Sequence, residues 1–316
     1  MTPPLPVNRG IHAALVVPIG PDDSIDEAGY LRQLDHVLDA PGLAGLLVNG
    51  HAGENGTTSD EEKARIVRLT RERVPANLSI TSGVLAESAH HGARQAALLE
   101  AAGVDAVLVF PPFSWALGVE PSTVLSHHRI IHDAVSTPLL LYAAPVGGPL
   151  AYSEAVRDEL ITLRNVRGIK DGSWEVAASE RLTARVKSTR PDMMVMGSGD
   201  EHLLLNYFIG TEGSQVSLAA PIPHLVCRLW EAAEAQDWAT ARACHARLQP
   251  LAHLIYHAAP ASRANARLKA CLAILGVIDS DRMRLPHQPI PREEYPALER
   301  ALRACADMPA AGGAEH

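Results

Sequence analysis

The chain has 316 residues, of which 47% are apolar and 20% are charged, and its formal net charge at pH 7 is −8. A chain of this length can bury one large hydrophobic core or two smaller ones. The negative net charge argues against nucleic acid or an anionic membrane as the main partner, since both bind preferentially to basic surfaces. No apolar stretch reaches the ~18 residues that a membrane-spanning helix needs.

The four cysteines lie far apart in the last third of the chain, without a CxxC pair: Cys227, Cys244, Cys271 and Cys305. This spacing is typical of reduced cysteines and not of a disulfide framework or a metal site. The first residues, MTPPLPVNRG, lack the apolar segment of a signal peptide. We therefore expect a soluble cytoplasmic protein.

Eight short apolar runs recur along the first 219 residues. Each run is continuous rather than alternating, as expected for strands buried on both faces of a parallel sheet. The runs are residues 12–17, 43–48, 78–84, 105–110, 138–143, 166–170, 193–197 and 214–219.

Helical segments separate these runs. Thr58 or Ser59 precedes three acidic residues, which is a good N-cap with an acidic first turn. Gly103 stands where a C-cap glycine belongs. Eight strands that alternate with helices predict an α/β protein, a (β/α)8 TIM barrel. A doubly wound open sheet is the rival fold, but no glycine-rich phosphate loop follows the first strand.

Nearly a hundred residues follow the eighth strand, and they have helical character. We assign residues 1–225 to the barrel that carries the active site. Residues 226–308 form the last barrel helix and a C-terminal helical extension, and residues 309–316 are expected to be a disordered tail.

The unusual residues fall at the carboxyl ends of the predicted strands, where TIM barrels place their active sites. Tyr142 ends the fifth strand and Lys170 ends the sixth. Residues 49–55 follow the second strand, residues 111–115 the fourth and residues 197–202 the seventh. We expect these segments to meet at one mouth of the barrel.

Lys170 is followed at once by Asp-Gly-Ser, which cannot extend the apolar run. An amine in a partly apolar barrel mouth has a lowered pKa, and its neutral form attacks ketones to give a Schiff base. Tyr142, on the neighbouring strand, is placed to transfer protons. The alternative is a rim lysine that pairs with a carboxylate, and position alone does not separate the two readings.

Five motifs occur in the order and at the strand ends typical of one family: the opening GIHAALVVPI, the GHAGE loop (50–54), LLLYAAP, GIKDGS and GSGDE. Together with RLKACLAILG and RLP near the C-terminus, they extend from about Gly10 to Pro286. The chain resembles the dihydrodipicolinate synthase and N-acetylneuraminate lyase superfamily of Schiff-base-forming class I aldolases.

The resemblance implies a role for several residues. Lys170 would form the Schiff base and Tyr142 would relay protons. The backbone amides of Ala52 and Gly53 would hold the substrate carboxylate. The remaining substrate-binding candidates are Ser114, Gly199, Asp200, Glu201 and Gln215. The family needs neither metal nor organic cofactor and usually forms homotetramers built as dimers of dimers.

Three departures from the family pattern argue against a true dihydrodipicolinate synthase. His51 and Ala52 replace a pair of hydroxyl residues. Phe113 lies in the segment where the synthases carry a second tyrosine, and Gly147 stands where they carry an arginine for the carboxylate of the aldehyde substrate. A missing charge partner for a carboxylate weakens both affinity and specificity.

Several roles stay open at this point. His51 is a candidate general acid or base, or a hydrogen-bond donor to the substrate. Asp200 and Glu201 resemble the acidic pair with which sialic acid lyases bind sugar hydroxyls, but they could equally be structural or cap a helix. Trp115 and Trp174 could wall the pocket or pack the barrel rim.

His128 and His132 are four residues apart on a predicted helix, as a metal-binding pair can be. No acidic or histidine partner is evident nearby in the sequence. We expect a solvated helix face here, and no metal site in the protein.

The sequence thus predicts a Schiff-base lyase that acts on pyruvate or a pyruvate-derived 2-oxo acid by aldolase-type C–C cleavage or condensation. One alternative is a dehydratase of a 2-keto-3-deoxy sugar acid that uses the same lysine. Another is a non-catalytic barrel that binds 2-oxo acids.

Overall fold

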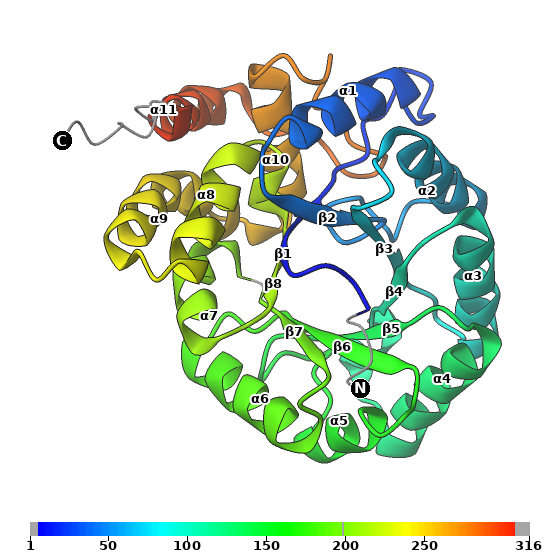
Figure 1. Cartoon of the computed structure of the whole chain (residues 1–316). Helices are drawn as coiled ribbons and strands as arrows, with labels where there is room; N and C mark the ends of the chain where they lie inside the picture. The colour runs from blue at the N-terminus through cyan, green and yellow to red at the C-terminus, as the bar shows by residue number, and fades with distance from the viewer. Residues whose placement is uncertain (1–5, 198, 307–316) are drawn as a thin grey trace.

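The computed structural model describes residues 6–197 and 199–306, and the predicted tail at 309–316 lies outside this range. Eight parallel strands form one sheet in the order β7-β6-β5-β4-β3-β2-β1-β8. The sheet closes because Gly197, after β7, donates its N–H to Gly213 of β8 at 2.8 Å. Figure 1 shows the strands at the centre of a ring of helices. The predicted TIM barrel is confirmed.

Each predicted apolar run overlaps one strand. The strands are β1 (Gly10–Ala14), β2 (Leu43–Val48), β3 (Ser79–Val84), β4 (Ala106–Val109), β5 (Leu139–Ala143), β6 (Val166–Asp171), β7 (Met194–Met196) and β8 (Gly213–Val216). The last run was expected to extend to residue 219, but Ser217–Ala219 forms a 3-10 turn instead. Continuous burial along β1 to β4 matches the unalternating apolar pattern.

The barrel helices are α1 (Glu27–Leu38), α2 (Asp60–Arg73), α3 (Ala89–Ala102), α4 (Pro121–Ala134), α5 (Glu154–Leu160), α6 (Val176–Thr189), α7 (Leu203–Ile209) and α8 (Pro223–Glu234). Ser59 forms a capping box with Glu62 at the start of α2. Gly103 ends α3 with a φ of +101°, a conformation that favours glycine. None of the described helices is long and apolar enough to cross a membrane.

The C-terminal extension consists of α9 (Trp238–Ala252), a π-helical turn (His253–His257), α10 (Ala264–Ile274) and α11 (Tyr295–Ala306). The expected boundary at residue 225 falls inside α8. The extension reaches the mouth of the barrel, because Asn265 of α10 donates a hydrogen bond to the carbonyl of His51 at 2.6 Å.

One helix face differs from the prediction. His128 was expected on a solvated face of α4, but it is fully buried, and its Nδ1 lies 2.9 Å from the carbonyl oxygen of Val124. Its ring packs near Tyr152, with the ring centres 5.8 Å apart. The prediction was wrong because a single sequence does not show which neighbours cover a helix. Burial lowers the pKa of His128 to about 4, so its ring is neutral.

Candidate active site

Lys170 and Tyr142 are direct neighbours across the sheet. The register of β5 and β6 pairs Tyr142 with Lys170 and Ala143 with Asp171. Since side chains alternate along a strand, Tyr142 and Lys170 point into the barrel while Ala143 and Asp171 point outward. The Lys170 Nζ lies 5.8 Å from the centre of the Tyr142 ring, and both residues are buried.

A cavity of about 210 Å³ fills the mouth of the barrel around this pair. It brings together eight of the ten predicted site residues: His51, Ala52, Tyr142, Lys170, Gly199, Asp200, Glu201 and Gln215. The other two do not line it. The Gly53 N–H donates a hydrogen bond to the carbonyl of Gly50 at 3.0 Å. Ser114 lies in the 3-10 turn Phe113–Leu117, where its N–H is 3.3 Å from the Glu87 carboxylate.

Lys170 has the electrostatics of a nucleophile. Burial lowers its pKa to about 8, although the charge of Asp200 opposes the shift. At pH 7 about a tenth of such amines are neutral, against less than a thousandth for a free lysine. Among the described residues, Nζ has neither a hydrogen bond nor an ion pair. This favours the nucleophile over the rim lysine paired with a carboxylate.

Tyr142 stays protonated beside this amine. Burial and the negative charge of Asp171 raise the pKa of Tyr142 to about 12. The position of the phenol depends on Gly172, where a Cβ atom would lie 2.6 Å from the Tyr142 oxygen. The sequence analysis did not identify Gly172 as a site residue, although its position two residues after Lys170 could have indicated a close approach of the chain to the site.

Three rings pack together on the side of the cavity that faces β4. His51 lies edge-on to Tyr142 with ring centres 5.3 Å apart, and Phe110 contacts both rings at 4.4 and 4.8 Å. His51 is exposed at the open mouth of the cavity. Desolvation and the Lys170 charge lower the pKa of His51, which makes the ring a neutral donor or acceptor. Phe110 was overlooked because it ends an apolar run.

The loop after β2 offers a site for a carboxylate. Ala52 lines the cavity, and its N–H has no hydrogen-bond acceptor within the part of the chain that the structure describes. The turn around it is fixed, since the Gly50 carbonyl accepts from the N–H groups of Gly53 and Asn55. A preorganised free N–H is a good partner for a carboxylate oxygen.

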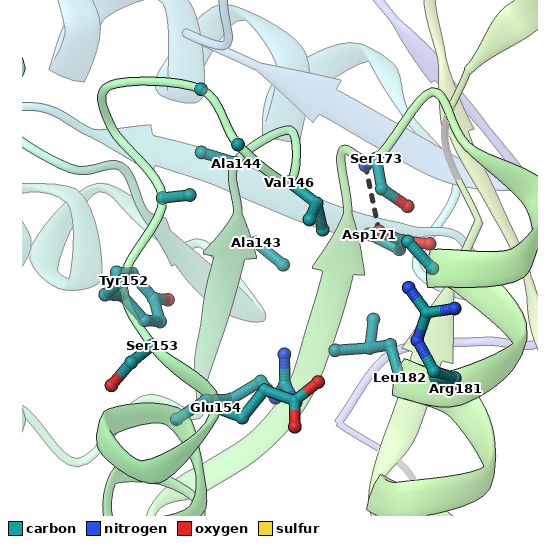
Figure 2. A pocket seen from close by; sticks show the side chains of 15 residues that line it. Ala143, Ala144, Val146, Tyr152, Ser153, Glu154, Asp171, Ser173, Arg181 and Leu182 are labelled. Carbon is teal, nitrogen blue, oxygen red and sulfur yellow. Dashed lines mark hydrogen bonds and ion pairs between the residues drawn. The ribbon is translucent and has the colours of Figure 1, made fainter.

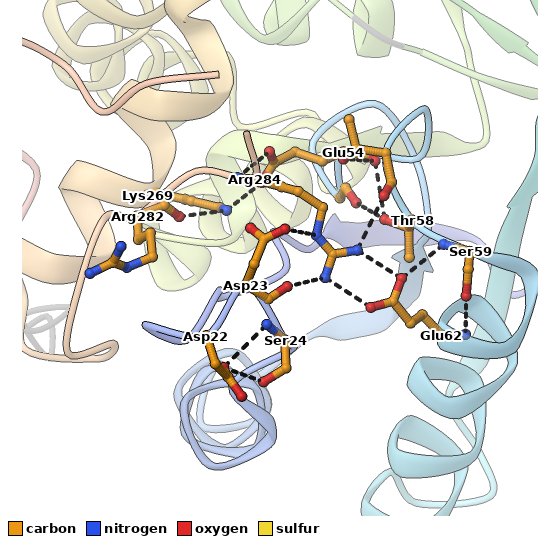
Figure 3. Close-up of polar contacts among 12 residues, drawn as sticks. Asp22, Asp23, Ser24, Glu54, Thr58, Ser59, Glu62, Lys269, Arg282 and Arg284 are labelled. Atoms are coloured by element: carbon orange, nitrogen blue, oxygen red, sulfur yellow. Dashed lines mark hydrogen bonds and ion pairs between the residues drawn. The ribbon is translucent and has the colours of Figure 1, made fainter. Parts of the chain in front are cut away.

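Buried charges anchor the same loop to the C-terminal extension (Figure 3). Glu54 pairs with Lys269 of α10, and their side chains are only 4% and 0% exposed. Arg284 holds Glu62 of α2 through two hydrogen bonds of 2.7 and 2.8 Å. The buried Glu54–Lys269 pair holds the loop in position, because removing either partner leaves an uncompensated buried charge.

The opposite wall contains a polar cluster that the sequence only partly revealed. Asp200 accepts hydrogen bonds from the N–H of Leu218 at 2.7 Å and from the Ser217 hydroxyl at 3.4 Å. Ser217 also lies 2.6 Å from the hydroxyl of Tyr256, which comes from the π-helical turn. Burial raises the pKa of Asp200 to about 6. No signal in the sequence placed Ser217 and Tyr256 in the site.

Glu201 and the two tryptophans differ in how far they face the cavity. Glu201 lines it, and its carboxylate lies 2.9 Å from Nε2 of His257. Trp174 lines the cavity and is half exposed. Trp115 packs against His127 instead, with ring centres 5.3 Å apart, and belongs to the rim.

A family model identifies the family to which the chain belongs. Residues 7–305 match the model of the dihydrodipicolinate synthetase family. The chain belongs to this family. Family membership confirms the predicted resemblance and identifies the protein as an enzyme, a lyase of the class I aldolase type.

Individual relatives agree with this assignment. The chain is 30% identical over 298 residues to 4-hydroxy-tetrahydrodipicolinate synthase of Bifidobacterium longum, which covers 92% of each chain.

Two solved structures share the fold. One is a prophage protein of the dihydrodipicolinic acid synthase family from E. coli K12 in complex with pyruvate, with a TM-score of 0.87, 22% identity and coverage of 94% of this chain and 98% of that one. The other is N-acetylneuraminate lyase from Fusobacterium nucleatum, with a TM-score of 0.82, 21% identity and coverage of 93% and 98%.

Proposed function

We propose that this lyase makes or breaks a C–C bond in pyruvate or a pyruvate-derived 2-oxo acid, with Lys170 as the Schiff-base nucleophile. The observation that carries the proposal is a buried, unpaired amine with a pKa of about 8, set beside a protonated phenol in one cavity. The structural neighbour from E. coli was solved with pyruvate, which supports the choice of this substrate.

The geometry suggests how the steps proceed. The substrate carboxylate binds at the Ala52 N–H, which places the 2-oxo carbon near Lys170. The neutral amine adds to that carbon, and a proton moves from the amine nitrogen to the carbonyl oxygen, which becomes a hydroxyl. Tyr142 donates a proton to this hydroxyl, which leaves as water while the C=N bond of the iminium forms. The Tyr142 phenolate regains a proton from the C4 hydroxyl as the C3–C4 bond breaks. The iminium accepts the electron pair of that bond, and an aldehyde and an enamine result.

His51 is the second candidate for proton transfer. Its neutral ring faces Tyr142 at 5.3 Å, in the loop that also holds the substrate carboxylate. A neutral imidazole at this position can take the proton from the hydroxyl of the departing aldehyde.

We further propose that the protein is not a 4-hydroxy-tetrahydrodipicolinate synthase, although a curated relative has that activity. Gly147 takes the place of the arginine that the resemblance assigns to the carboxylate of the aldehyde substrate. It has a φ of +76°, and a Cβ atom there would meet nothing within 4 Å. No side chain at this position can hold a second carboxylate.

Borohydride trapping tests the proposal. With pyruvate and borohydride, mass spectrometry should show one reduced adduct on Lys170. The adduct should disappear in Lys170→Ala and persist in Lys187→Ala, a matched lysine on α6. Tyr142→Phe should slow its formation without abolishing it. Failure to trap any 2-oxo acid on Lys170 contradicts the proposal.

Product analysis separates the three predicted activities. A lyase releases pyruvate and an aldehyde from a 4-hydroxy-2-oxo acid, whereas a dehydratase would release water and retain the carbon chain. A binding protein would form the adduct and release nothing. Only the first outcome supports the proposal.

We also infer that the protein forms a homotetramer, as its family usually does. The 3-10 turn Phe113–Leu117 exposes two large apolar side chains, since Leu117 is 94% and Phe113 is 49% exposed. Exposed apolar groups on one short segment are typical of an interface. Light scattering should give four times the protomer mass, and Leu117→Asp should reduce it.

A further inference from the structure

A second cavity lies outside the barrel wall, between the loop that connects β5 to α5 and the first turns of α6 (Figure 2). Its volume is about 420 Å³, and it shares no lining residue with the active-site cavity. Strand alternation explains the separation. Tyr142 and Lys170 point into the barrel, whereas Ala143 and Asp171 point outward to this second cavity.

The inner end of the cavity carries two buried polar groups without full partners. Asp171 is 1% exposed and Ser173 is 6% exposed. One Asp171 oxygen accepts the N–H of Ser173 at 2.9 Å. Within the described chain, Oδ2 of Asp171 and Oγ of Ser173 have no hydrogen-bond partner. Buried polar atoms in native proteins are almost always paired, so this end of the cavity lacks a donor.

Two guanidinium groups line the same cavity. Nε of Arg157 is buried without a partner among the described residues, and its Nη2 lies 3.8 Å from Glu154, which is longer than a hydrogen bond. Arg181 extends from α6 toward Asp171 and Ser173 (Figure 2), and the described residues give it neither a hydrogen bond nor an ion pair. Guanidinium groups bind carboxylates and phosphates. The carboxylates of Glu154 and Asp171 in the same lining favour a ligand with a single negative charge, such as a carboxylate.

We propose that this cavity binds a small carboxylic acid that also carries an amino or hydroxyl group. The carboxylate contacts Arg157 and Arg181, and the amino or hydroxyl group donates to Asp171. Glu154 and Asp171 balance the charge of the two arginines, so an amino acid or a hydroxy acid fits better than a dianion. The Ala143, Val146 and Leu182 side chains cover the carbon chain of the ligand.

Calorimetric titration with three isosteric acids tests this site. The probes are L-alanine, L-lactate and propionate, which differ only in the group on Cα. We use the Lys170→Ala variant so that the active-site amine takes no part. L-alanine, L-lactate or both should bind saturably, and propionate should bind about tenfold more weakly because it lacks the donor. The probe that binds tighter identifies the donor as an amino or a hydroxyl group.

Variants then place the binding in this cavity. Arg181→Gln should weaken binding by about tenfold. Arg242→Gln, on the exposed surface of α9, is the matched control and should change nothing. In the unsubstituted protein, the methyl NMR signals of Val146 should shift on titration. The proposal is wrong if no probe binds saturably, if propionate binds as tightly as the others, or if Arg181→Gln behaves like Arg242→Gln.

Discussion

The loops after β2 and after β5 border the same active-site mouth but are built differently. The β2 loop is fixed from several sides, by the buried Glu54–Lys269 pair and by the hydrogen bond from Asn265 to His51. The β5 loop has few such contacts: Val146 is 62% exposed and Gly147 has open space around it. The proposed reaction assigns the substrate carboxylate to the fixed loop, which supplies His51 and Ala52 to the active-site cavity. The open loop makes few contacts, so we expect substitutions there to change substrate preference at little cost in stability.

The largest expected effect comes from breaking the anchor of the fixed loop. Glu54→Gln leaves the Lys269 ammonium buried without its partner and should lower the free energy of unfolding by about 3–5 kcal/mol. Urea denaturation measures this loss. Glu159→Gln, in the exposed pair with Arg129, is the control and should change stability by about 0.5 kcal/mol or less. Equal effects of the two substitutions would show that the β2 loop is not anchored by its buried charges.

The second effect concerns Lys170, which lines the active-site cavity. Its pKa is about 8 in the folded protein and 10.5 in an ordinary lysine, so the unfolded chain binds more protons between these two pH values. Stability should therefore rise with pH across this window. At pH 7, Lys170→Met should be more stable than the unsubstituted protein by about 3 kcal/mol.

Denaturation of both proteins at pH 7 and near pH 10.5 measures this difference. The advantage of Lys170→Met should disappear at the higher pH. A difference that does not depend on pH would mean that the amine is fully hydrated in the folded protein.

The third prediction tests how tightly the strand end positions the phenol. Gly172→Ala places a methyl group on the Tyr142 oxygen and should slow pyruvate adduct formation by about 10–100-fold. Adduct mass spectrometry over time gives the rate. Ala177→Gly, on the exposed surface of α6, is the control and should leave the rate unchanged. An unchanged rate in Gly172→Ala would show that the position of the Tyr142 phenol does not affect adduct formation.

The smallest expected effect lies in the open loop. Gly147→Arg should cost about 1–2 kcal/mol of stability, because φ is positive there and only glycine adopts it freely. Pyruvate trapping should persist, and aldehydes that carry a carboxylate should become better substrates. Gly147→Ala controls for the backbone cost. Loss of pyruvate trapping in Gly147→Arg would mean that this loop also affects binding of the carboxylate and keto group that all 2-oxo acids share.

The barrel could be predicted from the sequence, because eight short apolar runs that do not alternate fit strands covered on both faces. The absence of a glycine-rich phosphate loop after the first run argued against the doubly wound sheet. The sequence also predicted Lys170 and Tyr142 as neighbours, since both stand at strand ends and parallel strands meet at one mouth. The register of β5 and β6 places the two residues side by side.

Packing between distant segments, and not the local pattern, brings the remaining residues to the site. Tyr256, Ser217 and Phe110 come from distant segments, and their proximity depends on how the extension and the strands pack. Gly172 matters because a side chain there would contact the Tyr142 ring on the neighbouring strand, and the sequence does not show this contact. The burial of His128 likewise depends on which elements cover α4. Local pattern fixes which face of an element is apolar, whereas contacts between elements decide what each side chain finally touches.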